Sequence, residues 1–169
     1  MQKKQEFESR LLELNRVTRV TAGGRQFRFR ALVVVGNKIG KVGVGIAKGN
    51  DASEAIEKAT KQAKKKVITV PIKGGTIPFD ITIKYHSVKI FLRPQKKGMG
   101  IIAGGIVRVI CDLAGISNVT GKLISKTNNK VNISRATIKA FEELGELGGV
   151  EDVKEIKKEE EAEKITKNL

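Results

Sequence analysis

Residues 21–48 hold the side chains best suited to binding a polyanion, and they read TAGGRQFRFRALVVVGNKIGKVGVGIAK. Successive side chains of a strand point to opposite faces, so Arg28 and Arg30 share a face with Gln26 in a strand over this segment. The alternation predicts a second, apolar face made of Phe27, Phe29, Ala31, Val33 and Val35. We therefore expect a sheet that builds a core on one face and offers guanidinium groups to phosphate on the other.

The candidate RNA-binding residues form two groups in the sequence. The first group comprises Arg16, Arg19, Gly23, Gly24, Arg25, Arg28, Arg30, Lys38, Lys41 and Lys48. The second group comprises Lys122, Lys126, Asn128, Lys130, Asn132 and Arg135. Cations bind the phosphate backbone, and asparagine amides beside a helix start can add hydrogen bonds to sugar or phosphate. An asparagine-rich turn with a helix cap is an equally good interpretation of Asn128, Asn129 and Asn132.

The charge of the chain supports a nucleic-acid partner. Its 33 Lys and Arg against 18 Asp and Glu give a net charge of +15 and a sequence pI near 10.0. Residues 1–150 hold 28 basic and 11 acidic residues, or +17, whereas residues 151–169 hold 5 and 7, or −2. Solubility needs far less charge, so this excess indicates an RNA or DNA surface. With no Trp and one Tyr, readout of shape and phosphates in folded RNA is favoured over base stacking.

A glycine-rich stretch, Gly98–Gly105, supports a competing hypothesis. Gly98, Gly100 and Ala103 fit the pattern GxGxxA, whose backbone amides can bind a phosphate at a helix start. A dinucleotide site also needs an acidic residue about 20 positions later, and residues 118–125 contain none. Structural glycines are therefore favoured. A nucleotide-dependent enzyme using this loop is the alternative function, and an RNA chaperone or regulator is the third.

The remaining reactive side chains do not favour catalysis. Cys111 is the only cysteine and lies in an apolar stretch, which predicts a buried thiol in a reducing compartment. His86 is the only histidine, and we expect it at the surface between two strands. Glu142, Glu143 and Glu146 fit a solvated helix face. No spacing suits a metal site, so we expect no catalytic residue, no cofactor and no metal.

The first of two structural units is expected to follow the order β-β-β-α. Its strands are predicted over residues 16–21, 25–35 and 40–47, with a short helix or strand over residues 7–14 and a further run over residues 67–70. The helix should begin with Asp51 and Glu54 as a capping box. Its apolar stripe is predicted to comprise Ala52, Ala55, Ile56, Ala59 and Ala63.

The second unit is expected to be a smaller α/β layer. Its strands are predicted over residues 77–83, 88–92 and 119–124, and its helices over residues 106–114 and 134–144. Gly115 should end the first helix, and residues 126–132 should form a polar loop. The predicted boundaries are an N-terminal extension over residues 1–10, a first domain over 11–72, a second over 73–149 and a charged tail over 150–169.

Targeting signals are not evident in the sequence. The opening MQKKQEFESR is too charged for a secretory signal, and no run approaches the ~18 apolar residues that cross a bilayer. We therefore expect the protein to act where it is translated, without a membrane partner.

Three separated segments resemble ribosomal protein five of the bacterial-type small subunit. They read NRVTRVTAGGRQFRFRALVVVGNKIGKVGVGIAKG, IIAGGIVRVICDLAGI and KVNISRAT, in the right order within residues 11–147. The resemblance implies an α+β fold in which a domain like a double-stranded-RNA-binding domain precedes an α/β domain also seen in small-molecule kinases. It implies a structural, non-enzymatic protein that binds ribosomal RNA and supports subunit assembly, decoding accuracy and the messenger entry path.

The resemblance also implies partners and site residues. The partners would be small-subunit ribosomal RNA, ribosomal proteins four and eight, and nearby messenger RNA, in a cytoplasmic ribosome or that of a plastid or other organelle. Residues 19–25 match the segment near the spectinomycin site, and Arg135 matches the arginine that opens the last helix. Gly98, Gly100 and Arg108 match the region facing ribosomal protein four.

The sequence departs from this family at several positions. Ala22 stands where Lys is common, Ala47 where Gly is usual and His86 where Gly is frequent. Lys96 and Lys97 replace small residues or Pro. The loop over residues 125–131 is one residue longer than usual and lacks an Asn-Pro step, so its contacts follow least directly from the resemblance.

Overall fold

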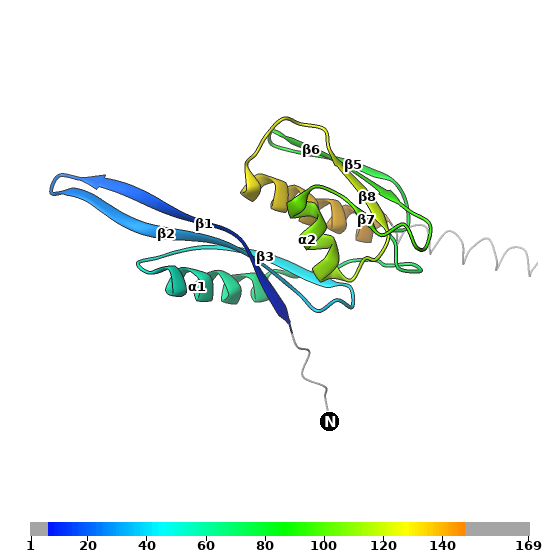
Figure 1. The fold of residues 1–169 in the computed structure, drawn as a ribbon, viewed down its shortest axis with the longest axis horizontal. Coiled ribbons are helices and arrows are strands. Elements are labelled where there is room, and N and C mark those ends of the chain that lie inside the picture. Colours follow the sequence, from blue (N-terminus) through cyan, green and yellow to red (C-terminus); the bar gives the residue numbers. More distant parts are fainter. Residues whose placement is uncertain (1–6, 148–169) are drawn as a thin grey trace, which may run out of the picture.

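Two four-stranded sheets enclose a layer of helices, and one further helix covers the outside of the first sheet (Figure 1). The computed structural model describes residues 7–147. Its layers are α1, the first sheet, α2 together with a helix over residues 130–147, and the second sheet. This arrangement confirms the α+β class and the order of a β-β-β-α unit followed by a smaller α/β unit.

The first sheet is antiparallel, with the strand order β1-β2-β3-β4. It comprises β1 (Glu8–Thr21), β2 (Gly24–Gly36), β3 (Lys41–Gly49) and β4 (Val67–Thr69). Between β3 and β4 the chain forms α1 (Ala52–Lys65). Residues 7–14, for which the sequence left helix or strand open, lie almost wholly in β1.

The second sheet has the order β5-β6-β8-β7, in which only β7 and β8 are parallel. Its strands are β5 (Ile81–Tyr85), β6 (Val88–Pro94), β7 (Ile101–Ile102) and β8 (Val119–Leu123). The helix α2 (Gly105–Ala114) connects β7 to β8. The strand predicted over residues 77–83 begins only at Ile81, because Pro78 lacks an amide hydrogen for a strand ladder.

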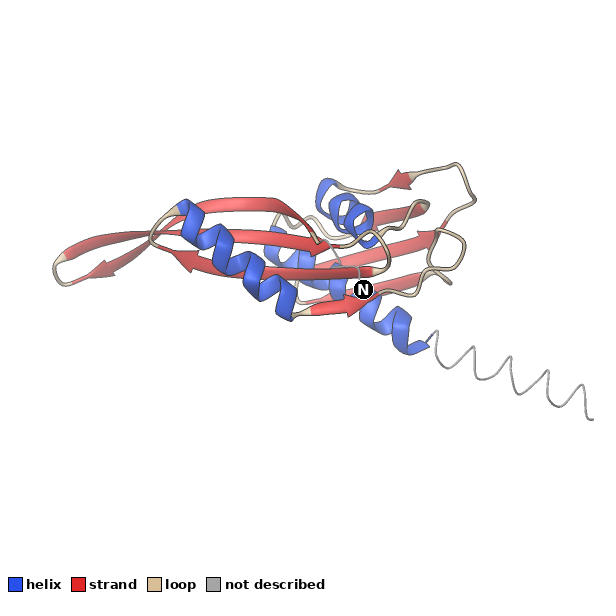
Figure 2. Cartoon of the chain, turned by 90° about the horizontal axis from the view of Figure 1, so that it is seen from below, coloured by secondary structure: helices blue, strands red, loops and turns tan. Residues whose placement is uncertain are grey.

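Close contact between α1 and the first sheet depends on small residues, and Figure 2 shows this helix lying across the strands. The predicted stripe is confirmed: Ala55, Ala59 and Ala63 are buried against a cluster of β2 residues. Gly45 of β3 faces this helix, and a Cβ at that position would overlap the carbonyl oxygen of Ala59. Glycine is therefore required there for close approach of backbone to backbone.

The start of α1 differs from the predicted capping box. Asp51 occupies the N-cap position, but its side chain makes no capping hydrogen bond. The Glu54 carboxylate instead accepts a hydrogen bond from the amide of Asn50 at 2.7 Å. Contact with Lys58 and this amide hold the pKa of Glu54 below its usual value. Of the two predicted capping residues, only Glu54 therefore makes a side-chain hydrogen bond to the backbone here.

The opposite face of the first sheet shares one core with the second unit. Val34, Val42 and Val70 pack in the same cluster as Phe141 and Leu144 of the 130–147 helix. Such burial contributes about 25 cal/mol per Å² of apolar surface. The two units are therefore joined by a continuous apolar layer.

The end of α2 docks on the turn between β2 and β3. The amides of Lys38 and Gly40 donate hydrogen bonds to the carbonyl oxygens of Leu113 and Ala114 at 3.0 and 2.8 Å. Gly115 ends α2 with φ = 90°, as predicted, and a Cβ there would overlap the Lys38 carbonyl. These contacts fix the orientation of the second unit on the sheet.

The last helix, predicted over residues 134–144, begins earlier in the structure. This helix begins at Lys130 rather than at Ser134, so the predicted polar loop over residues 126–132 is shorter. Asn129 explains the earlier start, because its Oδ1 accepts a hydrogen bond from the amide of Asn132 at 3.4 Å. The predicted charged tail lies outside the described residues. None of the helices within residues 7–147 has the length and apolarity that crossing a membrane requires.

Candidate nucleic-acid interface

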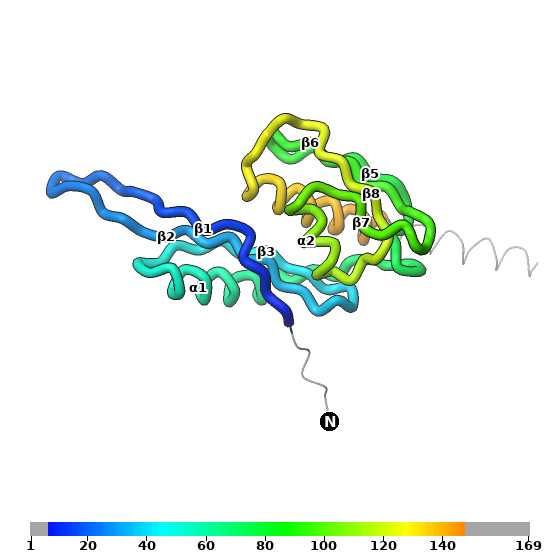
Figure 3. The backbone as a smooth tube through the Cα atoms, viewed as in Figure 1, coloured from blue at the N-terminus to red at the C-terminus, as the bar shows by residue number. Residues whose placement is uncertain are grey.

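A two-stranded hairpin of β1 and β2 projects beyond α1 and the second unit (Figure 3). The strands pair from Glu8–Gly36 to Thr21–Gly24, whereas β3 accompanies β2 only as far as Phe29. Gly23 and Gly24 lie at the tip, where nothing approaches within 4 Å of an added Cβ. The projecting part therefore exposes both of its faces.

One face of the hairpin combines cations with an exposed aromatic ring. Arg16 lies opposite Phe29, and its guanidinium lies over the Phe27 ring, 3.7 Å from the ring centroid. Arg25 shares this face, opposite Val20. Phe27 is 48% exposed, so its predicted place in the core is wrong: α1 ends its cover of the sheet before this residue. Ala31, Val33, Val35 and Phe29 do pack against α1, as predicted.

The other face changes from apolar to cationic along β2. Leu32 is buried and lies opposite Ile46, whereas Arg30 lies opposite both Lys48 and Asn15. Farther out, Arg28 lies opposite Val17, and Arg19 opposite Gln26. The predicted separation of Arg28 and Arg30 from the phenylalanine face is confirmed.

A basic corner forms where the second unit stops covering this face. We define it by Arg28, Arg30 and Lys48 on the sheet and Lys130 at the start of the 130–147 helix. The loop that carries Lys126 and Asn128 descends to this helix start on the hairpin side of the second unit (Figure 1). The corner therefore combines cations from the first sheet with a cation from the last helix.

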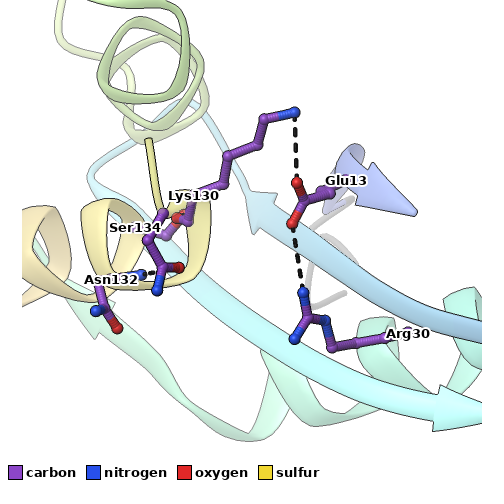
Figure 4. Close-up of polar contacts among 6 residues, drawn as sticks. Glu13, Arg30, Lys130, Asn132 and Ser134 are labelled. Atoms are coloured by element: carbon purple, nitrogen blue, oxygen red, sulfur yellow. Dashed lines mark hydrogen bonds and ion pairs between the residues drawn. The ribbon is translucent and has the colours of Figure 1, made fainter. Parts of the chain in front are cut away.

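Glu13 lies between the Arg30 and Lys130 side chains of the basic corner (Figure 4). Its carboxylate oxygens lie 3.9 Å from the Arg30 guanidinium and 3.5 Å from the Lys130 ammonium. The Glu13 side chain is only 20% exposed. A single carboxylate therefore links the hairpin to the second unit and partly neutralises two cations of the corner.

The asparagines near the corner act in part as a helix cap. Asn129 accepts the amide hydrogen of Asn132, and its own amide donates to Thr127 at 3.3 Å. Asn132 lies in the first turn of the helix and Arg135 in the second, rather than at its start. Asn128 is exposed in the preceding loop.

Three predicted cations lie away from the basic corner. Lys38 and Lys41 belong to the opposite end of the first sheet, and Lys122 is exposed on β8 of the second sheet. Lys38 is paired with Glu8 at 2.7 Å, and this contact holds the pKa of Glu8 below its usual value. These residues cannot contribute to a single phosphate-binding surface with Arg28 and Arg30.

Comparison with known proteins identifies the family. Residues 7–71 match the model of the ribosomal protein S5 N-terminal domain, and residues 83–156 match that of its C-terminal domain. The chain belongs to the ribosomal protein S5 family. A relative from Thermotoga neapolitana, named small ribosomal subunit protein uS5, is 43% identical over 92% of this chain and 87% of its own. One from Campylobacter jejuni with the same name is 46% identical over 82% of this chain and 93% of its own.

Membership of the ribosomal protein S5 family confirms two predictions from the sequence. The resemblance to ribosomal protein five is correct, and the protein is a structural ribosomal component rather than an enzyme. The family does not by itself assign roles to individual residues, so the candidate contacts stay predictions that depend on the geometry described above.

In this member of the ribosomal protein S5 family, two amides of the glycine-rich loop already form hydrogen bonds within the protein. The amides of Gly98 and Gly100 both donate to Oδ1 of Asn118, at 3.0 and 3.1 Å. Arg108 donates to the carbonyl oxygen of Ile101 at 2.8 Å. These two amides are therefore unavailable to a phosphate. Met99 and Ile102 beside them are 56% and 50% exposed, which favours an apolar contact there.

Sequence reasoning missed several residues around the corner. Glu13 offered no signal, because a single acidic residue in a mixed-charge segment gives no hint of its cross-strand neighbours. Lys66 and Lys139 lie near Arg135 around a hollow between the two units. The cluster of lysines at the end of α1 was visible in the sequence, but its proximity to the last helix depends on the tertiary fold.

Proposed function

We propose that this protein is a component of the small ribosomal subunit that holds folded ribosomal RNA in the basic corner and along the projecting hairpin. The change from buried Leu32 to exposed Arg28 on one face of β2 carries this proposal. The strand that carries these cations continues into a packed core, so the backbone positions of the cations are fixed before RNA binds. Preorganisation reduces the ordering entropy that binding would otherwise cost.

The residues proposed to contact RNA divide into three sets by location. One set contacts the RNA backbone between the two units, and it comprises the corner residues Arg28, Arg30, Lys48 and Lys130 together with Asn132 and Arg135 in the next turns of the last helix. Hairpin residues reach farther into the RNA, and they are Arg16, Arg19, Gly23, Gly24 and Arg25. Peripheral residues contact separate RNA segments, and they are Lys38, Lys41, Lys122, Lys126 and Asn128.

Contacts with protein neighbours are proposed at the other side of the second unit. Gly98, Gly100 and Arg108 would face ribosomal protein four, with Met99 and Ile102 as the apolar contact. Exposed apolar residues surrounded by polar ones are typical of protein interfaces. Ribosomal protein eight and the messenger RNA path are further proposed neighbours, through which the protein supports subunit assembly and decoding accuracy in a cytoplasmic or organellar ribosome.

Co-sedimentation tests the proposed assembly. We expect the native protein to sediment with small ribosomal subunits in a density gradient and to stay there at moderate salt. A protein found only in the soluble fractions of the gradient would contradict the proposal. A nucleotide titration with saturable binding that salt does not weaken would instead favour the enzyme alternative.

Salt dependence tests the mode of binding. Each phosphate neutralised by a cation releases counterions, so log K should fall linearly with log salt. Arg28→Gln should reduce the slope of that line by about 1. Lys84→Gln is a matched control, because Lys84 is an exposed cation on the second sheet. Equal slopes for both variants would contradict the placement of RNA in the corner.

A further inference from the structure

A groove lies between the edge of β3 and the 130–147 helix. Its apolar lining comprises Val44 and Ile46 of β3 and Ile138 of the helix, and Tyr85 and Gln62 also line it. Its volume is about 330 Å³, near the lower end of the ~300–1,000 Å³ found for small-ligand pockets. The groove therefore has room for one flat ring system with its attached groups.

Cations surround this apolar lining. Lys66, Arg135 and Lys139 line the groove together with Glu142. Lys139 is paired with Glu143 at 3.8 Å, whereas within residues 7–147 neither Lys66 nor Arg135 forms an ion pair. The groove thus offers two unpaired positive charges beside an apolar surface.

Positive charge continues from the groove along α1. A neighbouring hollow shares Ile46 and Lys66 with the groove and adds Lys58, Lys61 and Lys65. Lys58 and Lys61 are each paired with a glutamate one turn earlier on the helix. An anionic partner that extends from the groove along α1 would therefore meet further positive charge.

An extended acidic peptide is the first candidate occupant, because β3 has a free edge here. β4 pairs with β3 only from Lys41 to Gly43, which leaves the strand from Val44 onward unpaired on that side. The amide of Ile46, however, donates to Oε1 of Gln62 at 3.0 Å. An edge whose amide is already bound is a poor template for an added strand, so a peptide is disfavoured.

An RNA nucleotide matches both features of the groove. A base presents an apolar face that can pack on aliphatic side chains. The phosphate of the nucleotide is negatively charged and can pair with Lys66 and Arg135. The groove also borders the basic corner, because Ile46 of the groove and Lys48 of the corner are two residues apart on the same face of β3. RNA bound in the corner can therefore reach the groove along the same face of the first sheet.

We propose that this groove receives one unpaired nucleotide of the bound RNA, with its base on Val44, Ile46 and Ile138 and its phosphate between Lys66 and Arg135. The inference rests on the proposed function, because it needs RNA in the basic corner. It goes beyond that function by assigning a contact to a base rather than to the backbone alone.

The test compares two short RNA hairpins that differ only in one bulged uridine. We expect the full-length protein to bind the bulged hairpin about fivefold more tightly or better, in line with the contribution of one base contact. In methyl NMR spectra, the signals of Ile46 and Ile138 should shift with the bulged hairpin. Ile39 is an internal control, because it is exposed in the turn at the far end of the first sheet.

Variants separate this inference from the proposed function. Arg135→Gln should reduce the preference for the bulged hairpin to nearly one, whereas Lys84→Gln on the second sheet should leave it unchanged. RNA binding without a shift of the groove methyls would overturn the inference and leave the proposed function standing. If the protein binds neither hairpin, both the inference and the proposed RNA binding are contradicted. A methyl shift with poly-glutamate but not with RNA would assign the groove to an acidic protein and also overturn the inference.

Discussion

Glu13 of β1 and Lys130 of the last helix lie 3.5 Å apart across the junction of the two units. Within residues 7–147 this is the one ion pair that the Lys130 ammonium forms, and the Glu13 carboxylate also pairs with Arg30. The carboxylate therefore occupies the position between Arg30 and Lys130 at which the proposed RNA phosphate would bind. Glu13 links the two units in the free protein and, under the proposed function, competes with RNA for these two cations.

Glu13→Gln should therefore strengthen RNA binding. Partly exposed ion pairs contribute about 0–1 kcal/mol each, so releasing Arg30 and Lys130 predicts about two- to tenfold tighter binding. The measurement is a titration of structured RNA at several salt concentrations. Asp80→Asn is the control, because it frees Arg93 from a similar pair on the second sheet. Unchanged or weaker binding by Glu13→Gln would show that the carboxylate does not compete.

Charge reversal should weaken RNA binding at both Arg28 and Arg30 but lower stability only at Arg30. Arg28→Glu should weaken RNA binding and leave the thermal melt unchanged, because this exposed side chain lies opposite Val17. Arg30→Glu should weaken binding and also lower stability by about 0.2–1 kcal/mol, since two carboxylates would then face each other at Glu13. Melting curves and RNA titrations of both variants check this. A lower melting temperature for Arg28→Glu would count against its assigned face.

Local patterns predicted most of the strands and helices of this chain. The alternation from Ala31 to Val35 and the alanine spacing of α1 each identify the buried face, because periodicity reports directly on which side chains share a surface. Gly115 was likewise predictable, since few other residues end a helix in the left-handed conformation. Cys111 and His86 lie where their surroundings predicted, one buried and one exposed.

The errors arose where tertiary contacts override the local pattern and where a helix cap lies within a polar stretch. Phe27 continues the apolar alternation of β2, but the helix that would cover it ends its reach near Phe29. The start of the last helix was missed because Asn129 caps it from within a polar stretch that resembles a loop. The basic corner depends on how far the second unit covers the sheet, and no spacing in the sequence encodes that distance.

Two phenylalanines should differ sharply in their effect on stability. Phe141→Ala should destabilise the fold by about 3–5 kcal/mol, because Phe141 is fully buried in the shared core. Phe27→Ala should cost about 1 kcal/mol or less, chiefly the exposed cation–π contact with Arg16. Denaturant unfolding measures both. A large loss for Phe27→Ala would mean that the ring is covered in solution.

Cys111 should be unreactive in the folded protein. Burial raises the pKa of its thiol to about 12, and only the thiolate is nucleophilic. At pH 8 an aromatic disulfide reagent should leave the native thiol unmodified while it labels the denatured chain completely.

Because the unfolded thiol of Cys111 ionises at a lower pH than the folded one, stability should also fall as the pH rises above about 9. Cys111→Ala should lack this part of the alkaline decline, and rapid labelling of the native protein would contradict the burial.

Gly45→Ala should destabilise the first unit, whereas Gly23→Ala should not. A methyl group at Gly45 would overlap the Ala59 carbonyl, so α1 must move away from β3. Overpacking of this kind costs about 1–3 kcal/mol, equivalent to a melting temperature lower by roughly 2–12 °C in a chain of this size. Gly23 has open space around it at the hairpin tip, so its variant should melt like the wild type.

If the tip approaches RNA closely, Gly23→Ala should weaken RNA binding without changing stability. Equal RNA binding by this variant and the wild type would exclude the tip from the interface.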